Sequence, residues 1–168
     1  MSSVRRVIIG LLASVAVLLV GVSAAPAANA QERSRTTLVA HLSAKNEVPA
    51  CPAGVESGAE GVAIIRVDGA TGKIRYAVVV TDLPDTIAGS PGVHIHAGAS
   101  GQTGGIVQHF ELTGRNDGLV AAGTATNPAL AADILANPEN YYVNVHTRAC
   151  LPGTVRGQLR SLHADLPR

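Results

Sequence analysis

The sequence predicts an all-β fold, namely an antiparallel β-sandwich of Greek-key-like type with one short helix. Two observations support this prediction. Runs rich in β-branched residues recur at intervals of about ten residues, with glycine or proline between them. One segment, by contrast, combines helical spacing of its apolar residues with start and stop signals for a helix. The sequence shows no internal repeat and no sign of a second domain.

The first thirty residues have the three-part pattern of a secretory signal peptide. Arg5 and Arg6 precede an apolar run that extends to Val22, and Ala28-Asn29-Ala30 supplies small residues for signal peptidase. We expect cleavage after Ala30, with cleavage after Ala24 as an alternative. The other interpretation is an uncleaved anchor, because no charge interrupts the stretch after Arg6. Only such an anchor would attach this protein to a membrane.

Cleavage would leave one domain in an exported protein. We expect residues 31–35 to be disordered, residues 36–162 to form the domain, and residues 163–168 to be a C-terminal tail. The predicted location is outside the cell or in the cell envelope.

Composition argues against nucleic acid as a partner. Loss of Arg5 and Arg6 lowers the count of Lys and Arg from 13 to 11 against 12 Asp and Glu, so the net charge falls from +1 to −1. The chain holds three Tyr, one Phe and no Trp. It therefore lacks both the basic stripe and the aromatic platforms that nucleic acids require.

The strand segments follow one another along the domain. The expected strands are residues 36–42, 61–67, 73–81, 93–96, 106–112, 119–123, 141–146 and 154–159. The glycine-containing stretch DGATG connects the second and third strands as a hairpin. The stretch TGRNDG suggests a second hairpin between residues 106–112 and 119–123.

The helix is predicted over residues 127–138, NPALAADILANP. Asn127 is a good N-cap and Pro128 suits the first turn. Leu130 and Ile134 lie four residues apart and therefore share one face. A second Asn-Pro pair, at residues 137–138, ends the helix.

Two cysteines, Cys51 and Cys150, remain in the exported chain. An even count in an oxidising compartment favours a disulfide between them. Two free thiols are the alternative. A bridge would close a loop of about 100 residues and stabilise the fold by roughly 4–5 kcal/mol in the chain-entropy model.

Three histidines are candidates for a metal site. His94 and His96 alternate with Val93 and Ile95, so both imidazoles lie on one face of their strand. In YYVNVH, His146 likewise lies opposite the aliphatic residues. If the two strands are neighbours, three imidazoles could hold one ion at about 2 Å from each nitrogen. The alternative is a structural role, in which these histidines form hydrogen bonds with residues such as Asn144 and Thr147.

The ligand types narrow the choice of metal to copper or zinc. The only methionine is Met1 and both cysteines are expected to pair, so ligands for a blue-copper or thiolate site are missing. Imidazole ligation suits copper(II) and zinc(II), and the general affinity order favours copper. His109 is a possible fourth ligand, although a solvated side chain is the simpler interpretation.

Glu47 and Arg156 stand out as charged residues in otherwise neutral motifs. We interpret them as structural residues that fix a loop, rather than as catalytic groups. Residues 98–101, GASG, lack the strand-to-helix context of a nucleophile elbow, and the glycine-rich loop lacks the ending of a phosphate-binding loop. The sequence therefore offers no nucleophilic or phosphate-binding motif.

Four motifs together resemble the chordin-type CHRD domain. They are LSAKNEVP at 42–49, GVHIHAGASGQTGGIV at 92–107, YYVNVHT at 141–147 and GTVRGQL at 153–159. The resemblance covers about residues 36–162 and implies a secreted or surface β-sandwich without an established enzymatic activity. The matching positions are Glu47, Pro49, His94, His96, Gly98, Asn144, His146, Arg156 and Gly157.

The resemblance leaves the binding partner open. Chordin binds growth factors through cysteine-rich modules that this chain lacks, so that partner is not transferred. An unidentified protein, a glycan or a metal ion remains. Cys51 and Cys150 are not part of the family pattern. A bridge between them would bring the loop with Glu47 to the His146 end of the fold, where Glu47 could support the histidines.

The order of the histidines also has a fainter similarity to the copper ligands of copper/zinc superoxide dismutase. His94, His96, His109 and His146 match those ligands in order. The zinc-binding cluster of that enzyme and the arginine beside its copper have no clear counterpart here. A dismutase-like metalloenzyme is therefore the alternative function.

Overall fold

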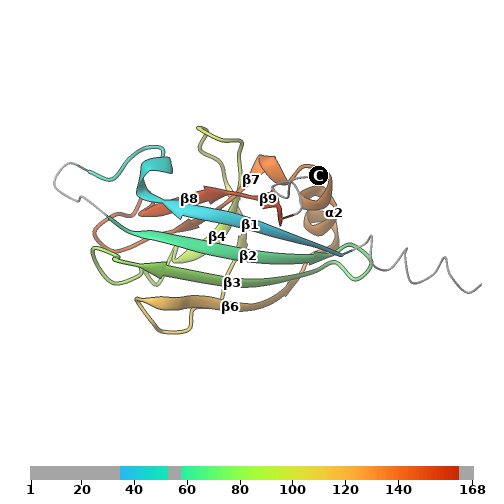
Figure 1. The fold of residues 1–168 in the computed structure, drawn as a ribbon, viewed down its shortest axis with the longest axis horizontal. Coiled ribbons are helices and arrows are strands. Elements are labelled where there is room, and N and C mark those ends of the chain that lie inside the picture. The colour runs from blue at the N-terminus through green and yellow to red at the C-terminus, as the bar shows by residue number, and fades with distance from the viewer. Residues whose placement is uncertain (1–34, 53–57, 163–168) are drawn as a thin grey trace, which may run out of the picture.

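The computed structural model describes residues 35–52 and 58–162. The predicted signal peptide, residues 31–34 and the predicted tail lie outside the described residues. The all-β prediction is confirmed, because antiparallel strands dominate and one short α-helix accompanies them (Figure 1). Within the described ranges, no helix is long and apolar enough to cross a membrane.

The nine strands of the described residues belong to one sheet with the order β5-β4-β7-β8-β1-β2-β3-β6, and β9 pairs with β1. The strands are β1 (Arg35–Ser43), β2 (Glu60–Asp68), β3 (Lys73–Thr81), β4 (Val93–Ala97), β5 (Ile106–His109), β6 (Gly118–Thr126), β7 (Tyr141–Val145), β8 (Val155–Gln158) and β9 (Arg160–Ser161). The helices are η1 (Ala44–Asn46), α2 (Pro128–Ala136) and η2 (Pro138–Asn140).

The sheet curves back on itself and forms two layers around one core. Strands β1, β2, β3 and β6 form one layer, and β5, β4, β7 and β8 form the other (Figure 1). Apolar side chains from both layers fill the space between them, including Leu38, Ile65, Ile95 and Val143. An isolated bridge between Leu112 and Ala121 nearly closes the sheet.

Local signals explain the best-predicted elements. At the turn between β2 and β3, the Asp68 carboxylate accepts hydrogen bonds from the backbone N–H groups of Ala70 and Thr71. In α2, Asn127 caps the helix by accepting from the backbone N–H of Leu130. Burial of Leu130 and Ile134 then fixes the helix against the core.

The structure corrects several sequence-based expectations. Arg35 belongs to the segment that the sequence predicts to be disordered, but it is the first residue of β1 and forms an ion pair with Asp68. The strand predicted over 106–112 ends at His109 and pairs with β4, whereas β6 pairs with β3. The predicted second hairpin is therefore shorter than expected: residues 111–113 pair with residues 119–122 through the bridge between Leu112 and Ala121 and the hydrogen bonds beside it. Short elements η1, η2 and β9 were not predicted.

Candidate metal centre

Strands β4 and β7 place three histidines on the side of the sheet that faces away from the core. Val93, Ile95, Val143 and Val145 belong to the core cluster, so the residues that alternate with them point outward. The register pairs His94 with Asn144 and His96 with Tyr142. His146 follows two residues after Asn144 and lies on the same side.

The three imidazoles converge, as the alternation pattern suggested. His94 Nε2 lies 2.6 Å from His96 Nε2 and 2.9 Å from His146 Nε2. The ligand atoms of all three lie within 4.8 Å of one another. His94 and His146 are buried, and His96 is half-buried.

Backbone carbonyl groups fix the tautomer of every ring in this cluster. The Nδ1–H groups of His94, His96 and His146 donate to the carbonyl oxygens of Pro91 (3.1 Å), Gly104 (2.7 Å) and Leu151 (2.6 Å), respectively. A carbonyl oxygen can only accept, so each Nδ1 carries the hydrogen. In each neutral ring the lone pair is then on Nε2 and points into the cluster.

Three acceptor atoms that face one another need a cation or a proton between them. Burial disfavours a proton in this position, because it destabilises the charged form of an imidazole ring. Burial, together with the positive charge that His146 and His96 would carry, lowers the pKa of His94 to about 3. Burial also lowers the pKa of His96 and of His146, against the opposing effect of their carbonyl hydrogen bonds. Neutral imidazoles in this arrangement suit a transition-metal ion.

His109 lies beside the cluster but outside it. It pairs with His94 across strands β4 and β5, so both side chains lie on the same side of the sheet. The ring centroids are 5.7 Å apart, and His109 is exposed. Within the described residues, the group of converging ligands contains His94, His96 and His146 without His109.

The His96 ring packs against Tyr142 of β7, which in turn packs against Arg156 of β8. The Tyr142 ring lies parallel to the His96 ring, with 4.7 Å between centroids. The guanidinium carbon of Arg156 lies 4.5 Å from the centroid of the Tyr142 ring. Arg156 is buried and donates through Nη1 to the carbonyl oxygen of Gln102, which holds the glycine-rich loop over the sheet.

Glu47 occupies a neighbouring polar pocket rather than the histidine cluster. A Cβ atom at Gly153 would lie 2.5 Å from Glu47 Oε2 and 2.7 Å from Asn144 Nδ2. Both side chains therefore pack directly against this glycine. Neither carboxyl oxygen of Glu47 has a hydrogen-bond partner within the described residues, and neither does Asn144 Oδ1. Burial raises the pKa of Glu47 to about 8, against the opposing effects of the Arg156 charge and the Asn144 amide.

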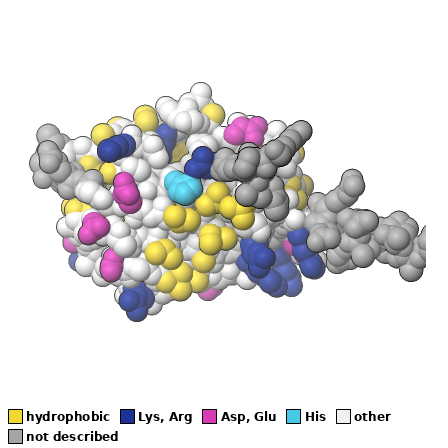
Figure 2. Space-filling model, in the orientation of Figure 1, with side chains coloured by type: hydrophobic (Ala, Val, Ile, Leu, Met, Phe, Trp, Pro, Cys, Tyr) yellow, Lys and Arg dark blue, Asp and Glu magenta, His cyan; other side chains and the backbone are white. Residues whose placement is uncertain are grey.

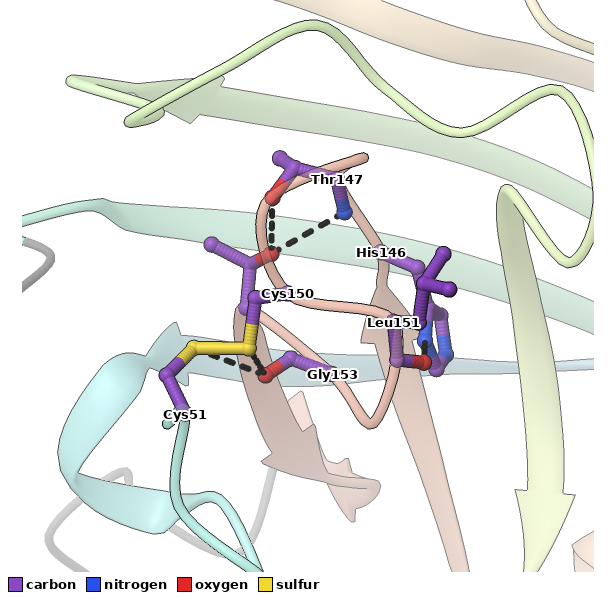
Figure 3. Close-up of a disulfide and its surroundings, with 7 residues drawn as sticks. Cys51, His146, Thr147, Cys150, Leu151 and Gly153 are labelled. Atoms are coloured by element: carbon purple, nitrogen blue, oxygen red, sulfur yellow. Dashed lines mark hydrogen bonds between the residues drawn. A yellow bond between two sulfur atoms is a disulfide. The ribbon is translucent and has the colours of Figure 1, made fainter. Parts of the chain in front are cut away.

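A disulfide holds the loop that orients His146. The predicted bond between Cys51 and Cys150 is present, with 5.5 Å between the Cα atoms. The loop from Thr147 to Gly153 folds beside this bond and brings the Leu151 carbonyl to the His146 ring (Figure 3). Thr147 further anchors the loop through its backbone N–H and hydroxyl group, which both contact the Thr154 hydroxyl.

Gly104 is a residue that the sequence did not single out. A Cβ at this position would lie 1.5 Å from the carbonyl oxygen of Ala97, so the backbone of β4 leaves room for glycine alone. The close approach brings the Gly104 carbonyl to His96 Nδ1. Such a carbonyl ligand leaves no side-chain pattern in the sequence, and a glycine in a glycine-rich loop is a weak signal.

We expect Gly104→Ala to weaken metal binding by about 10–100-fold, because the displaced loop would no longer orient His96. Gly105→Ala is the matched control, since nothing lies within 4 Å of a Cβ at Gly105. Calorimetric titration with copper(II) or zinc(II) measures the effect, and far-UV circular dichroism verifies the fold. Equal affinities for the two variants would contradict the positioning role of Gly104.

Comparison with known protein families identifies a match over most of the domain. A family profile described as "CHRD domain" matches residues 38–159. This range runs from within β1 to just beyond β8 and includes the three histidines, Glu47 and both cysteines. The comparisons found no matching curated protein and no matching solved structure.

Proposed function

Because this chain belongs to the CHRD domain family, we propose that it is an exported, non-catalytic binding module that holds one copper(II) or zinc(II) ion. The ligands in this proposal are Nε2 of His94, His96 and His146. Export is supported by the three-part pattern of residues 1–30 and by the disulfide, since disulfides persist in oxidising compartments.

The observation that carries the metal proposal is the common tautomer of the three rings. Each Nδ1–H is bound to a backbone carbonyl, so three Nε2 lone pairs meet in one place. A purely structural histidine cluster would be expected to exchange N–H hydrogen bonds between its rings. Three rings that present only acceptors to one another instead match the arrangement in which each metal-bound histidine is oriented through its other nitrogen.

The donor set favours copper(II) or zinc(II) over other ions. All three donors are imidazole nitrogens, and carboxylates are absent from the converging group within the described residues. Hard ions such as calcium and magnesium require oxygen ligands. Copper(II) lies above zinc(II) in the general affinity order. Three protein ligands would leave a coordination position for water or for a further ligand.

Metal titration of residues 31–168 tests this proposal. We expect one copper(II) or zinc(II) ion per chain with micromolar or stronger affinity, and a loss of at least about 100-fold in His94→Gln/His146→Gln, which lacks two of three ligands. His41→Gln is the matched control, because His41 is exposed on β1 and lies outside the cluster. Nitrogen hyperfine structure in the copper(II) spectrum identifies the ligands. Unchanged binding in the double variant would refute the site.

A dismutase-like activity is the second candidate function. Its support is the position of His109 beside His94, which reproduces the ligand order His94, His96, His109 and His146 on neighbouring strands. Redox chemistry of this kind needs an open coordination position and a copper ion that changes oxidation state. A superoxide dismutation assay on the copper-loaded protein, with zinc-loaded protein as control, separates this candidate from simple binding.

A further inference from the structure

The outward face of the layer formed by β1, β2, β3 and β6 is unusually apolar. Antiparallel strands with one solvated face normally alternate apolar residues inside with polar residues outside. On this face, however, four large apolar side chains point outward and remain well exposed. They are Val62 (36%), Ile64 (47%), Val79 (43%) and Leu119 (40%).

The strand register gathers these side chains into one patch. Val62 pairs with Val79, and Val79 pairs with Leu119. Ile64 lies in the next outward row, between Val39 of β1 and Ala77 of β3. Figure 2 shows the resulting band of hydrophobic side chains across the middle of this face. A continuous apolar patch on a sheet face marks an interaction surface.

Charges of opposite sign lie at the two ends of the patch. Along β2 the exposed residues read Glu60, Val62, Ile64 and Arg66, in that order. Arg66 pairs with Arg75 of β3, which adds a second positive charge at that end. The carboxylate of Asp68 does not cancel them, because it forms an ion pair with Arg35. In Figure 2 acidic side chains lie to the left of the band, with some Lys and Arg above and below them, and the largest group of Lys and Arg lies toward the lower right.

We propose that this face binds a second copy of the same chain in a two-fold symmetric dimer. The pattern along β2 is self-complementary about Ala63. When the two β2 strands run antiparallel across the interface, Glu60 of one chain faces the partner's Arg66, and Val62 faces the partner's Ile64. A two-fold axis repeats both contacts, so each charged end meets the opposite charge while the apolar rows cover each other.

A second copy fits this surface better than a membrane does. An anionic membrane would attract the Arg66 end but repel the Glu60 end, whereas a second copy satisfies both. Four strands of nine residues span about 30 Å by 19 Å. This footprint lies near the lower end of specific protein interfaces, so the dimer is expected to dissociate in the micromolar range. Sheets that pack face to face lie about 10 Å apart with their strands within about 30° of alignment.

Sedimentation equilibrium of the protein expressed from the full-length sequence tests the proposal. The wild type is expected to be a dimer at about 100 µM, and Glu60→Arg or Arg66→Glu alone is expected to weaken association by at least tenfold. The charge-swapped double variant Glu60→Arg/Arg66→Glu should restore dimerisation, since the two charges would again be opposite across the axis. Lys45→Glu is the control, because it changes the charge as Arg66→Glu does but lies in η1.

The possible results of these measurements either support or overturn the dimer. Rescue by the double variant supports the dimer, and Ile64→Lys should abolish association without changing the circular dichroism spectrum. A monomeric wild type at 100 µM, or single and double variants that associate equally, would overturn the proposal. Binding of the wild type to anionic vesicles with loss in Arg66→Glu, but no self-association, would assign the face to a lipid surface and also overturn it.

Discussion

Removal of the disulfide in the Cys51→Ser/Cys150→Ser variant is expected to lower the free energy of unfolding by about 4–5 kcal/mol. The bond joins residues separated by 99 positions in the sequence. It therefore closes a loop that spans most of the domain, and loss of such a crosslink increases the entropy of the unfolded chain. Chemical denaturation of both proteins, monitored by circular dichroism, measures the difference.

The same variant is expected to bind metal more weakly, even where it remains folded. The loop from Thr147 to Gly153 places the Leu151 carbonyl against His146 Nδ1, and Cys150 ties this loop to the segment after η1. Reduction of the wild type, followed by blocking of the two thiols and removal of the reductant, should reproduce both effects, which separates loss of the bond from effects of the serine side chains. Equal stability of the oxidised wild type and the double variant would contradict this role of the disulfide.

The strand pattern of the sequence predicted the histidine cluster well, because alternation is a local property. His94, His96 and His146 each lie opposite aliphatic residues, and the strands that carry them are neighbours in the sheet. The groups that hold the three imidazole rings in place could not be predicted in the same way. The carbonyl groups of Pro91, Gly104 and Leu151 are backbone atoms of loops. Their positions depend on how distant segments pack, and side-chain patterns do not encode them.

Long-range pairing explains the main error in the fold prediction. The turn TGRNDG favours a hairpin between the flanking segments, but β5 pairs with β4 because this arrangement continues the sheet beyond β7. The exposed face of β2 was missed for another reason. Its run GVAIIRV is β-branched on both sides of the strand, so the sequence predicts a strand without indicating that Val62 and Ile64 remain exposed.

Glu47 is a buried carboxyl group that should make the metal-free protein less stable as the pH rises above neutrality. Burial raises its pKa from 4.5 to about 8, although the nearby Arg156 charge opposes the change. Between these two values the native state keeps a proton that the unfolded state has lost. The native state is therefore favoured fully below pH 4.5, and this advantage is lost as the pH rises through 8. This difference between the two pKa values of Glu47 corresponds to roughly 5 kcal/mol of unfolding free energy.

The histidines titrate in the opposite direction and in a lower range. Burial lowers the pKa values of His94, His96 and His146 from 6.5, so on the acid side of pH 6.5 the unfolded state binds protons that the native state does not. Their effect is a stability that rises with pH and levels off above about 6.5. The difference between the wild type and Glu47→Gln from pH 6.5 to 8 therefore isolates Glu47.

Between pH 6.5 and 8 we expect the unfolding free energy of the wild type to fall by about 2 kcal/mol relative to that of Glu47→Gln, because the histidine contribution is common to both proteins. Glutamine is the suitable substitution because it keeps the size of the side chain but cannot ionise. The measurement is chemical denaturation at several pH values with a chelator present, which removes any stabilisation by bound metal. Parallel pH dependences for the two proteins would mean that Glu47 is already ionised at neutral pH, and that it compensates the buried charge of Arg156 despite the lack of a direct ion pair.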